Sequence, residues 1–278
     1  MHFDKELGNK NNMNILVCIK QVPDTPHVDI DPKTGNLKRE GADNKINLYD
    51  LYALETALAI RKECGGYVTA VSMGPPQAER AIREALTLGA DDGVLLSDRA
   101  FAGADVLATA YTVSQAIRSL GGFDLIICGK QTTDGDTAQV GPALAELLDI
   151  PHAALVTEIL NADNKQLSVR QDMGETFLDV CMPFPCLITI EKSKNTPRLP
   201  SYLCKKKFSD VKIRILSIND FEDNDTGKYG VNGSATQVER IFPPAVNTDK
   251  VTLTGTSDTL ASGIFDALTQ KQMIGENI

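Results

Sequence analysis

The sequence contains no tryptophan, and aromatic residues make up only 5% of its 278 residues. Its core must therefore be built from Val, Ile, Leu and Ala. No apolar run is long enough to cross a membrane. The polar start, MHFDKELGNKNN, has no apolar stretch like that of a signal peptide. We therefore expect a cytoplasmic protein without membrane insertion.

Basic residues are also in short supply. The chain has 28 Lys and Arg against 37 Asp and Glu, so its formal net charge is -9. This acidic balance argues against nucleic acid or an anionic membrane as the main partner. Hydrophobic residues make up 42%, which is ample for a core. The length suggests one large domain or two small ones.

Metal-binding and disulfide patterns are absent from the sequence. The six cysteines form no CxxC pair, and the histidines (His2, His27 and His152) are scattered, so we expect no metal site. Without a secretion signal, a disulfide framework is not expected either. Cys18 and Cys128 lie inside Val/Ile/Leu runs, which is typical of buried free thiols.

Buried strands and amphipathic helices alternate over the first half of the chain. Near-continuous apolar runs predict strands at residues 14–22, 67–74, 92–98 and 124–129. Helical spacing predicts helices at residues 46–64, 75–89, 104–120 and 139–149, several of them closed by glycine. This alternation predicts an α/β fold with a parallel, doubly wound sheet. Ligands of such folds bind at the carboxyl ends of the strands.

The pattern changes after about residue 151. Extended segments over 152–190 predict antiparallel additions to the sheet. A polar, basic stretch follows at 192–210, and a final helix is expected at 257–272 with Ser257 or Asp258 as its cap. We therefore divide the chain into a flexible tail (1–12), an α/β domain (13–218) and an extended C-terminal arm (219–278) that needs a partner surface.

A candidate site follows from where the strands end. Cys18 follows the apolar run NILV, and Met73 and Gly129 lie at the ends of two further predicted strands. These three residues should converge on one edge of the sheet. Gly129 opens a polar loop that runs into a helix, and exposed N–H groups at a helix N-terminus bind anions. Thr137 and Gln139 add side-chain donors, and Gly135 permits close approach of a ligand. A nucleotide phosphate is the natural occupant.

Two carboxylates in this loop leave a second interpretation open. Asp134 and Asp136 would repel a phosphate unless they face elsewhere, and either could cap the helix or bind a ribose hydroxyl. The spacing matches neither GxGxxG nor GxxxxGK[ST], so a capped helix without a ligand fits as well. There is no GxSxG motif and no catalytic nucleophile that stands out. His152 is interpreted as a loop or surface histidine, and the role of His27 stays open.

Several segments together resemble the β subunit of electron-transfer flavoprotein. They are NILVCIKQVPDT, VSMGPPQAERAIREALTLGAD and LIICGKQTTDGDTAQVGPALAELL, followed by PRLPSYLCKKK and GSATQVERIFPP. The resemblance covers nearly the whole chain from Met13. The stretch from Arg170 to Glu175 departs from it, because it is less acidic and less glycine-rich than the usual family signature.

The resemblance implies a flavodoxin-like or adenine-nucleotide-hydrolase-like fold and a heterodimer with an α subunit that carries one FAD. It also implies a nucleotide site in this chain, which holds AMP in simple electron carriers and a second FAD in bifurcating members. Matching positions give the cofactor-binding residues as Cys18, Asn47, Val71, Met73, Gly129, Asp134, Gly135, Thr137, Ala138, Gln139 and Val140.

We favour FAD, because residues 22–40 and GSATQVERIFPP look like the forms found in bifurcating members. NADH would then deliver a hydride to this flavin. One electron would go to ferredoxin and the other, through the α-subunit FAD, to a partner dehydrogenase. No catalytic side chain is required, because the flavin performs the chemistry.

A recognition-like loop at residues 195–207 would dock that dehydrogenase. Tyr202 or Leu203 would be its apolar anchor, and Lys205, Lys206 and Lys207 would steer an acidic partner. The plain interpretation of these three lysines is a solvated face. Two alternatives stand beside the bifurcating subunit. One is an electron-carrier subunit with structural AMP and no catalysis of its own. The other is a small adenine-nucleotide-binding protein of the stress-protein type, which would need neither the arm nor the loop.

Overall fold

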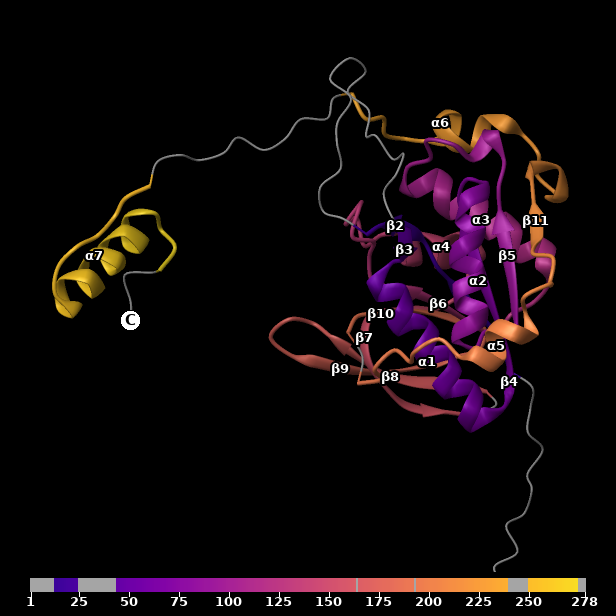
Figure 1. Ribbon diagram of the computed structural model, residues 1–278, viewed down its shortest axis with the longest axis horizontal. Helices are drawn as coiled ribbons and strands as arrows, with labels where there is room; N and C mark the ends of the chain where they lie inside the picture. Colours follow the sequence, from indigo (N-terminus) through magenta and orange to yellow (C-terminus); the bar gives the residue numbers. More distant parts are fainter. Residues whose placement is uncertain (1–12, 25–43, 164, 193, 240–249, 275–278) are drawn as a thin grey trace, which may run out of the picture. The chain divides into compact units, whose positions relative to one another are not determined.

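The computed structural model describes residues 13–24, 44–163, 165–192, 194–239 and 250–274 (Figure 1). The chain divides into two compact units, residues 1–239 and 240–278. The first contains the sheet and its helices. The second contains one described helix, α7 (Ser257–Gln270). The predicted tail (1–12) and most of the connection at 22–40 lie outside the described residues, as do His2 and His27.

The first unit is built on a nine-stranded sheet in the order β11-β5-β4-β1-β6-β10-β7-β8-β9. Strands from β11 to β7 in this order run parallel, which confirms the predicted α/β class. The bounds are β1 Met13–Cys18, β4 Gly66–Met73, β5 Asp92–Leu96, β6 Leu125–Gly129, β7 His152–Ala162, β8 Gln166–Asp172, β9 Phe177–Pro183, β10 Cys186–Ile190 and β11 Arg214–Leu216.

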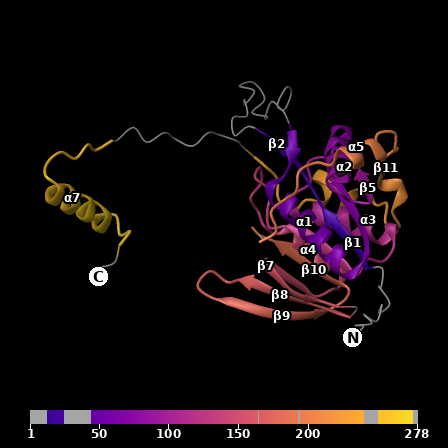
Figure 2. The same ribbon diagram turned by 60° about the horizontal axis from the view of Figure 1, so that its bottom comes forward.

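Of the segments expected at 152–190 to be antiparallel additions, β8 and β9 are antiparallel. β8 pairs antiparallel to β7, and β9 pairs antiparallel to β8. The three strands form one end of the sheet, where Figure 2 shows them together. The expectation was wrong for β10, which lies between β6 and β7 and runs parallel to both, because its apolar run is buried in the middle of the sheet. A small second sheet pairs β2 (Gln21–Pro23) with β3 (Asn44–Ile46).

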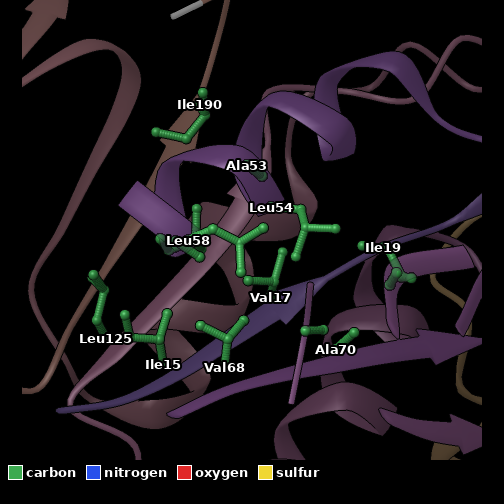
Figure 3. Packing of buried hydrophobic residues seen from close by; sticks show 14 of the residues in the cluster. Ile15, Val17, Ile19, Ala53, Leu54, Leu58, Val68, Ala70, Leu125 and Ile190 are labelled. Atoms are coloured by element: carbon green, nitrogen blue, oxygen red, sulfur yellow. The ribbon is translucent and has the colours of Figure 1, made fainter. Parts of the chain in front are cut away.

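Helices cover both faces of the sheet. They are α1 (Leu48–Cys64), α2 (Glu79–Leu88), α3 (Val106–Leu120) and α4 (Val140–Leu148). Alternate residues of β1 face opposite sides, as a strand buried on both faces requires. Ile15 and Val17 pack in the cluster of α1 and α2, where Figure 3 shows Leu54 and Leu58 beside them. Leu16 packs in the second cluster, with α3 and α4.

The predicted recognition loop contains a short helix. Residues 202–207 form α5 (Tyr202–Lys207), and the Ser201 side chain caps it by accepting a hydrogen bond from the Cys204 N–H. Residues before the helix are tied to the core, since the Ser201 N–H donates to the Thr87 carbonyl at 3.0 Å. The segment is therefore more ordered than a polar, proline-interrupted sequence suggested.

Residues 219–239 belong to the first unit, past the domain boundary expected at 218. Tyr229 is 1% exposed and Phe221 is 5% exposed. Both rings pack on Phe101, with centroid distances of 5.6 Å and 5.7 Å. Short helical turns connect these contacts: η3 (Ile218–Asp220), η4 (Thr226–Lys228) and α6 (Gly230–Gly233), with η1 (Pro76–Ala78) and η2 (Arg99–Phe101) earlier in the chain.

The remaining part of the predicted arm is described from residue 250. Helix α7 is capped by Thr256, whose side chain accepts from the Thr259 N–H, rather than by Ser257 or Asp258. Among the described residues, none of the α7 side chains is buried. Ile264 and Phe265 are each about half exposed, which leaves an apolar surface uncovered on this helix.

The described residues also bear on the expectations about membrane helices, thiols and metal ligands. No helix in the described parts of the chain combines the length and the apolar character that a membrane crossing needs. All six cysteines are described and are free thiols. The described residues contain no cluster of His, Cys, Asp and Glu able to hold a metal ion. His152 is exposed at the start of β7.

Candidate functional site

The three predicted strand ends do lie side by side. Cys18 at the end of β1 is in register with Val71 of β4 and with Cys128 of β6. Cys18, Met73 and Gly129 are partly exposed along this carboxyl edge. Val71 is only 2% exposed, and its carbonyl accepts the Ile19 N–H at 2.8 Å. Val71 therefore supports the floor of the edge and presents no free polar group to it.

Residues 130–139, here called the nucleotide loop, are tied to the start of α1 by Asn47. This side chain is fully buried. Its Nδ2 donates to the Gln131 carbonyl at 2.8 Å, and its Oδ1 accepts from the Thr133 N–H at 3.1 Å. Since both polar atoms are occupied by protein groups, Asn47 acts on a ligand through the shape of the loop.

Asp50 is the site residue that sequence reasoning missed. It is 5% exposed, and its carboxylate accepts from Asn47 Nδ2 at 3.0 Å and from the Lys20 N–H at 2.7 Å. Burial raises the pKa of Asp50 to about 7, although these hydrogen bonds and one from the Gly129 N–H act in the opposite direction. An aspartate in the first turn of a helix is a common N-terminal charge, so its sequence position gave no signal of this role.

The Cys128 thiol at this edge is not a nucleophile. A hydrogen bond with Cys18, burial and the nearby charge of Asp50 together raise the pKa of Cys128 well above its usual value. Cys128 therefore stays a neutral thiol at physiological pH.

Asp134 is neutralised by a lysine from the end of β1. Lys20 Nζ lies 2.9 Å from Oδ1 and 2.8 Å from Oδ2 of Asp134. Partial burial acts to raise the pKa of Asp134, but the Lys20 contact lowers it below its ordinary value. The carboxylate is thus ionised and paired, which removes much of its repulsion toward a phosphate. The sequence alone could not show this partner.

The tip of the loop holds two strained residues. Asp136 (φ 49°) and Ala138 (φ 55°) adopt left-handed backbone conformations that glycine favours. Each such residue costs roughly 1 kcal/mol or more and persists where the surroundings impose it. Gln131 Nε2 donates to Asp136 Oδ1 at 2.8 Å and holds one of them. Asp136 is therefore engaged within the loop.

The loop ends in the N-terminus of α4. Gln139 occupies the cap position, and within the described residues no side chain caps this helix. Its first N–H groups therefore remain available as donors to an anion. Thr137 and Gln139 are exposed beside them, while Val140 is partly exposed. These residues fit a nucleotide phosphate, since they combine donors with a compensated carboxylate and small side chains.

The predicted docking residues lie in a separate exposed group. Tyr202 is 76% and Leu203 is 77% exposed, and Leu199, which sequence reasoning did not single out, is 88% exposed. Lys205, Lys206 and Lys207 form the last turn of α5.

The base of this segment is fastened to α1. Arg198 Nε and Nη2 donate to the two carboxylate oxygens of Glu55 at 2.8 Å and 2.7 Å. The Arg198 N–H also donates to Glu55 at 3.1 Å. The exposed side chains of Leu199, Tyr202 and Leu203 therefore follow a residue that is held in place by α1.

Comparison with known proteins connects these features. Residues 34–215 match the model of the electron transfer flavoprotein domain, a stretch that includes the nucleotide loop and the docking residues. The chain belongs to the electron transfer flavoprotein family. It is 42% identical to the electron transfer flavoprotein subunit beta of Thermoanaerobacterium thermosaccharolyticum, over 94% of this chain and all of that protein.

Other members of the electron transfer flavoprotein family are similar over comparable lengths. Protein FixA of Azorhizobium caulinodans is 42% identical over 89% of this chain and 90% of its own length. The caffeyl-CoA reductase-Etf complex subunit CarD of Acetobacterium woodii is 41% identical over 94% of this chain and its whole length. The chain is therefore an electron transfer flavoprotein subunit of the β type.

Proposed function

We propose that this chain is the β subunit of a bifurcating electron transfer flavoprotein that binds FAD at the carboxyl edge of its sheet. In this proposal NADH is the hydride donor, ferredoxin takes one electron, and the α-subunit FAD passes the other to a partner dehydrogenase. The observation that carries the proposal is the uncapped N-terminus of α4 behind a loop in which the carboxylate of Asp134 is paired with Lys20.

Each site residue has a distinct task in this proposal. The first N–H groups of α4, with Thr137 and Gln139, bind phosphate, and Gly135 leaves room for it. Cys18 and Met73 line the nucleotide site with partly exposed, largely apolar side chains. The shape of the sheet edge and of the nucleotide loop is set by six further residues: Asn47, Val71, Gly129, Asp134, Ala138 and Val140. The flavin itself supplies the redox chemistry, so the chain contributes position and electrostatics.

The proposed partners dock elsewhere on the chain. Leu199, Tyr202 and Leu203 form an exposed apolar group of the kind that anchors protein interfaces, and the lysines after them would steer an acidic dehydrogenase. CarD is named as a subunit of a complex with a reductase, which supports such a partner here. We assign the uncovered apolar surface of α7 to the α subunit and place the complex in the cytoplasm.

The second candidate is an electron-carrier subunit with structural AMP. The observation in its favour is that the loop features fit any nucleotide phosphate and do not depend on what is attached to it. In that case this chain binds AMP, assembles with the α subunit and catalyses nothing itself.

Nucleotide analysis of the purified αβ complex separates the two candidates. Co-produced with its α subunit, the complex should release two FAD per αβ pair, and its visible flavin absorbance should bleach on addition of NADH. One FAD and one AMP per pair, with no bleaching by NADH, would establish the electron-carrier alternative instead.

A further inference from the structure

We infer that Asp50 positions the nucleotide loop, and that its ionised form is the one that supports tight nucleotide binding. The inference rests on the proposed nucleotide site at this edge. It assigns to a buried carboxylate a role in regulating that site by pH.

The carboxylate joins three separate elements. Oδ2 accepts from the Lys20 N–H at the end of β1, at 2.7 Å, and Oδ1 accepts from Asn47 Nδ2 at the start of α1, at 3.0 Å. The Gly129 N–H at the end of β6 donates to it as well. All three donors have fixed positions, so a side chain that only accepts is required here.

Asp50 also determines how the Asn47 amide is turned. The Asn47 side chain contacts three groups: the Asp50 carboxylate, the Gln131 carbonyl and the Thr133 N–H. Because Asp50 and Gln131 both accept, Nδ2 must face them and Oδ1 must face Thr133. An ionised Asp50 therefore fixes the one amide orientation that holds the loop at both Gln131 and Thr133.

A second connection joins Asp50 to the nucleotide loop through Lys20. Lys20, whose N–H is bound by Asp50, extends its ammonium group to Asp134 at 2.8 Å. The loop is thus held by Asn47 at one end and by Lys20 in its middle, and both of these residues depend on Asp50. Asp50 is a positioning residue, since it reaches the nucleotide only through them.

The chemistry of this network predicts a dependence on pH. Burial raises the pKa of Asp50 to about 7. Protonation of Asp50 puts an O–H donor where the Lys20 N–H, the Asn47 amide and the Gly129 N–H need an acceptor. The hydrogen bonds that hold Asn47, and through it the nucleotide loop, therefore weaken as pH falls through this range. The titratable groups facing Asp50 are Lys20, two residues after β1, and Cys128 on β6, whose pKa is raised well above its usual value by a hydrogen bond with Cys18 and by burial. Cys128 therefore stays neutral in this pH range.

The test measures nucleotide affinity of the full chain in complex with its α subunit, with AMP and FAD as the probes. Asp50→Asn keeps the volume but turns a donor toward fixed donors, and binding should weaken about tenfold. Asn47→Ala should cause a similar loss. The double variant should lose little more than either single one, because both act through the same tie.

Asp124→Asn is the matched control. Asp124 also accepts a backbone N–H, from Asn14 at 2.7 Å, but lies at the amino end of β6. The affinity of the Asp124→Asn complex for AMP and FAD should stay within about twofold of the wild-type value. Between about pH 8 and pH 6, wild-type affinity should fall about tenfold, while the profile of Asp50→Asn should be flatter. The phosphate of AMP titrates near pH 6 in both proteins, so the difference between them isolates Asp50.

The outcomes separate this inference from the proposed function. Wild-type affinity that does not change across this pH range overturns the inference even if Asp50→Asn fails to fold. Tight binding by a folded Asp50→Asn, or additive losses in the double variant, overturns it too and leaves the nucleotide site standing. A wild-type complex that binds neither probe through this chain overturns both.

Discussion

Gly129 lies so close to Asp50 that a Cβ atom on Gly129 would come within 2.2 Å of the Asp50 Oδ1 atom. The same Cβ would lie 2.8 Å from the Tyr49 carbonyl carbon. The end of β6 therefore packs directly on the first turn of α1. Glycine is required here by the fold itself, in addition to any demand from a ligand.

Gly129→Ala should accordingly destabilise the folded chain. Neither Tyr49 backbone nor the buried carboxylate can move without disturbing α1, so the free energy of unfolding should fall by about 1–3 kcal/mol. Denaturant unfolding monitored by circular dichroism measures this. Gly122→Ala is the control: among the described residues nothing lies within 4 Å of a Cβ at Gly122, so it should change stability by about 0.5 kcal/mol or less. Equal stability of both variants would contradict the packing argument.

The parts of the fold that the sequence predicted well depend on local patterns. In β1, Leu16 and Val17 face opposite clusters, and an unbroken apolar run is what such a strand requires. The helix expected to begin near Asn47 does begin at Leu48. Paired glycines mark helix ends in the chain, and Gly65 and Gly121 occupy C-cap positions.

The parts that were missed depend on contacts between distant segments. Tyr229 is buried because Phe101 and Phe221 surround it, and a sequence rich in Asn, Asp and Gly does not reveal that partner. Likewise, the role of Asp50 depends on the ends of β1 and β6, to which no spacing rule points. The edge was predictable from strand ends, whereas the network beneath it was not.

Gly135 offers a cleaner test of the nucleotide loop than Gly129. A Cβ at Gly135 would have Thr132 Oγ1 as its nearest neighbour at 3.4 Å, which is an ordinary contact. Gly135→Val should therefore change the free energy of unfolding only modestly, by about 0.5 kcal/mol. A valine side chain should block a phosphate that approaches the backbone, so nucleotide should be lost from the purified complex. Unchanged nucleotide content would show that the site lies elsewhere.

The raised pKa of Asp50 has a separate consequence for stability in the absence of nucleotide. Between about pH 4 and pH 7 the folded chain holds a proton on Asp50 that the unfolded chain has released. The contribution of this group to the free energy of unfolding therefore decreases as pH rises through that window. Other carboxylates, such as Asp134 with its lowered pKa, act in the opposite direction.

Comparison with Asp50→Asn isolates this contribution. The difference in free energy of unfolding between wild type and variant should change with pH from about 4 to 7 and level off above it. Urea unfolding at a series of pH values, with nucleotide removed, provides the measurement. A difference that is constant over this window would mean that Asp50 titrates normally in the folded chain.

The docking segment, residues 195–207, provides the last prediction. Glu55 holds Arg198 through both carboxylate oxygens, and although burial acts to raise the pKa of Glu55, the Arg198 contacts lower it below its usual value. Tyr202 belongs to this segment, which the Arg198–Glu55 contact holds in place. Tyr202→Ala should raise the KM for the partner dehydrogenase about tenfold, because an exposed aromatic anchor is lost, and should leave nucleotide content unchanged.

Glu55→Gln should raise the same KM by a smaller factor, about threefold, since it loosens the base of the segment without removing a contact to the partner. Tyr67→Ala is the matched control. Tyr67 is 47% exposed near the amino end of β4 and lies outside residues 195–207 in the chain, and its loss should leave the KM as in wild type. Steady-state reduction of the dehydrogenase by the complex measures all three variants. If Tyr202→Ala and Tyr67→Ala behave alike, residues 195–207 do not dock the dehydrogenase, and the exposure of Leu199, Tyr202 and Leu203 must serve another contact, of which the α subunit is the first to test.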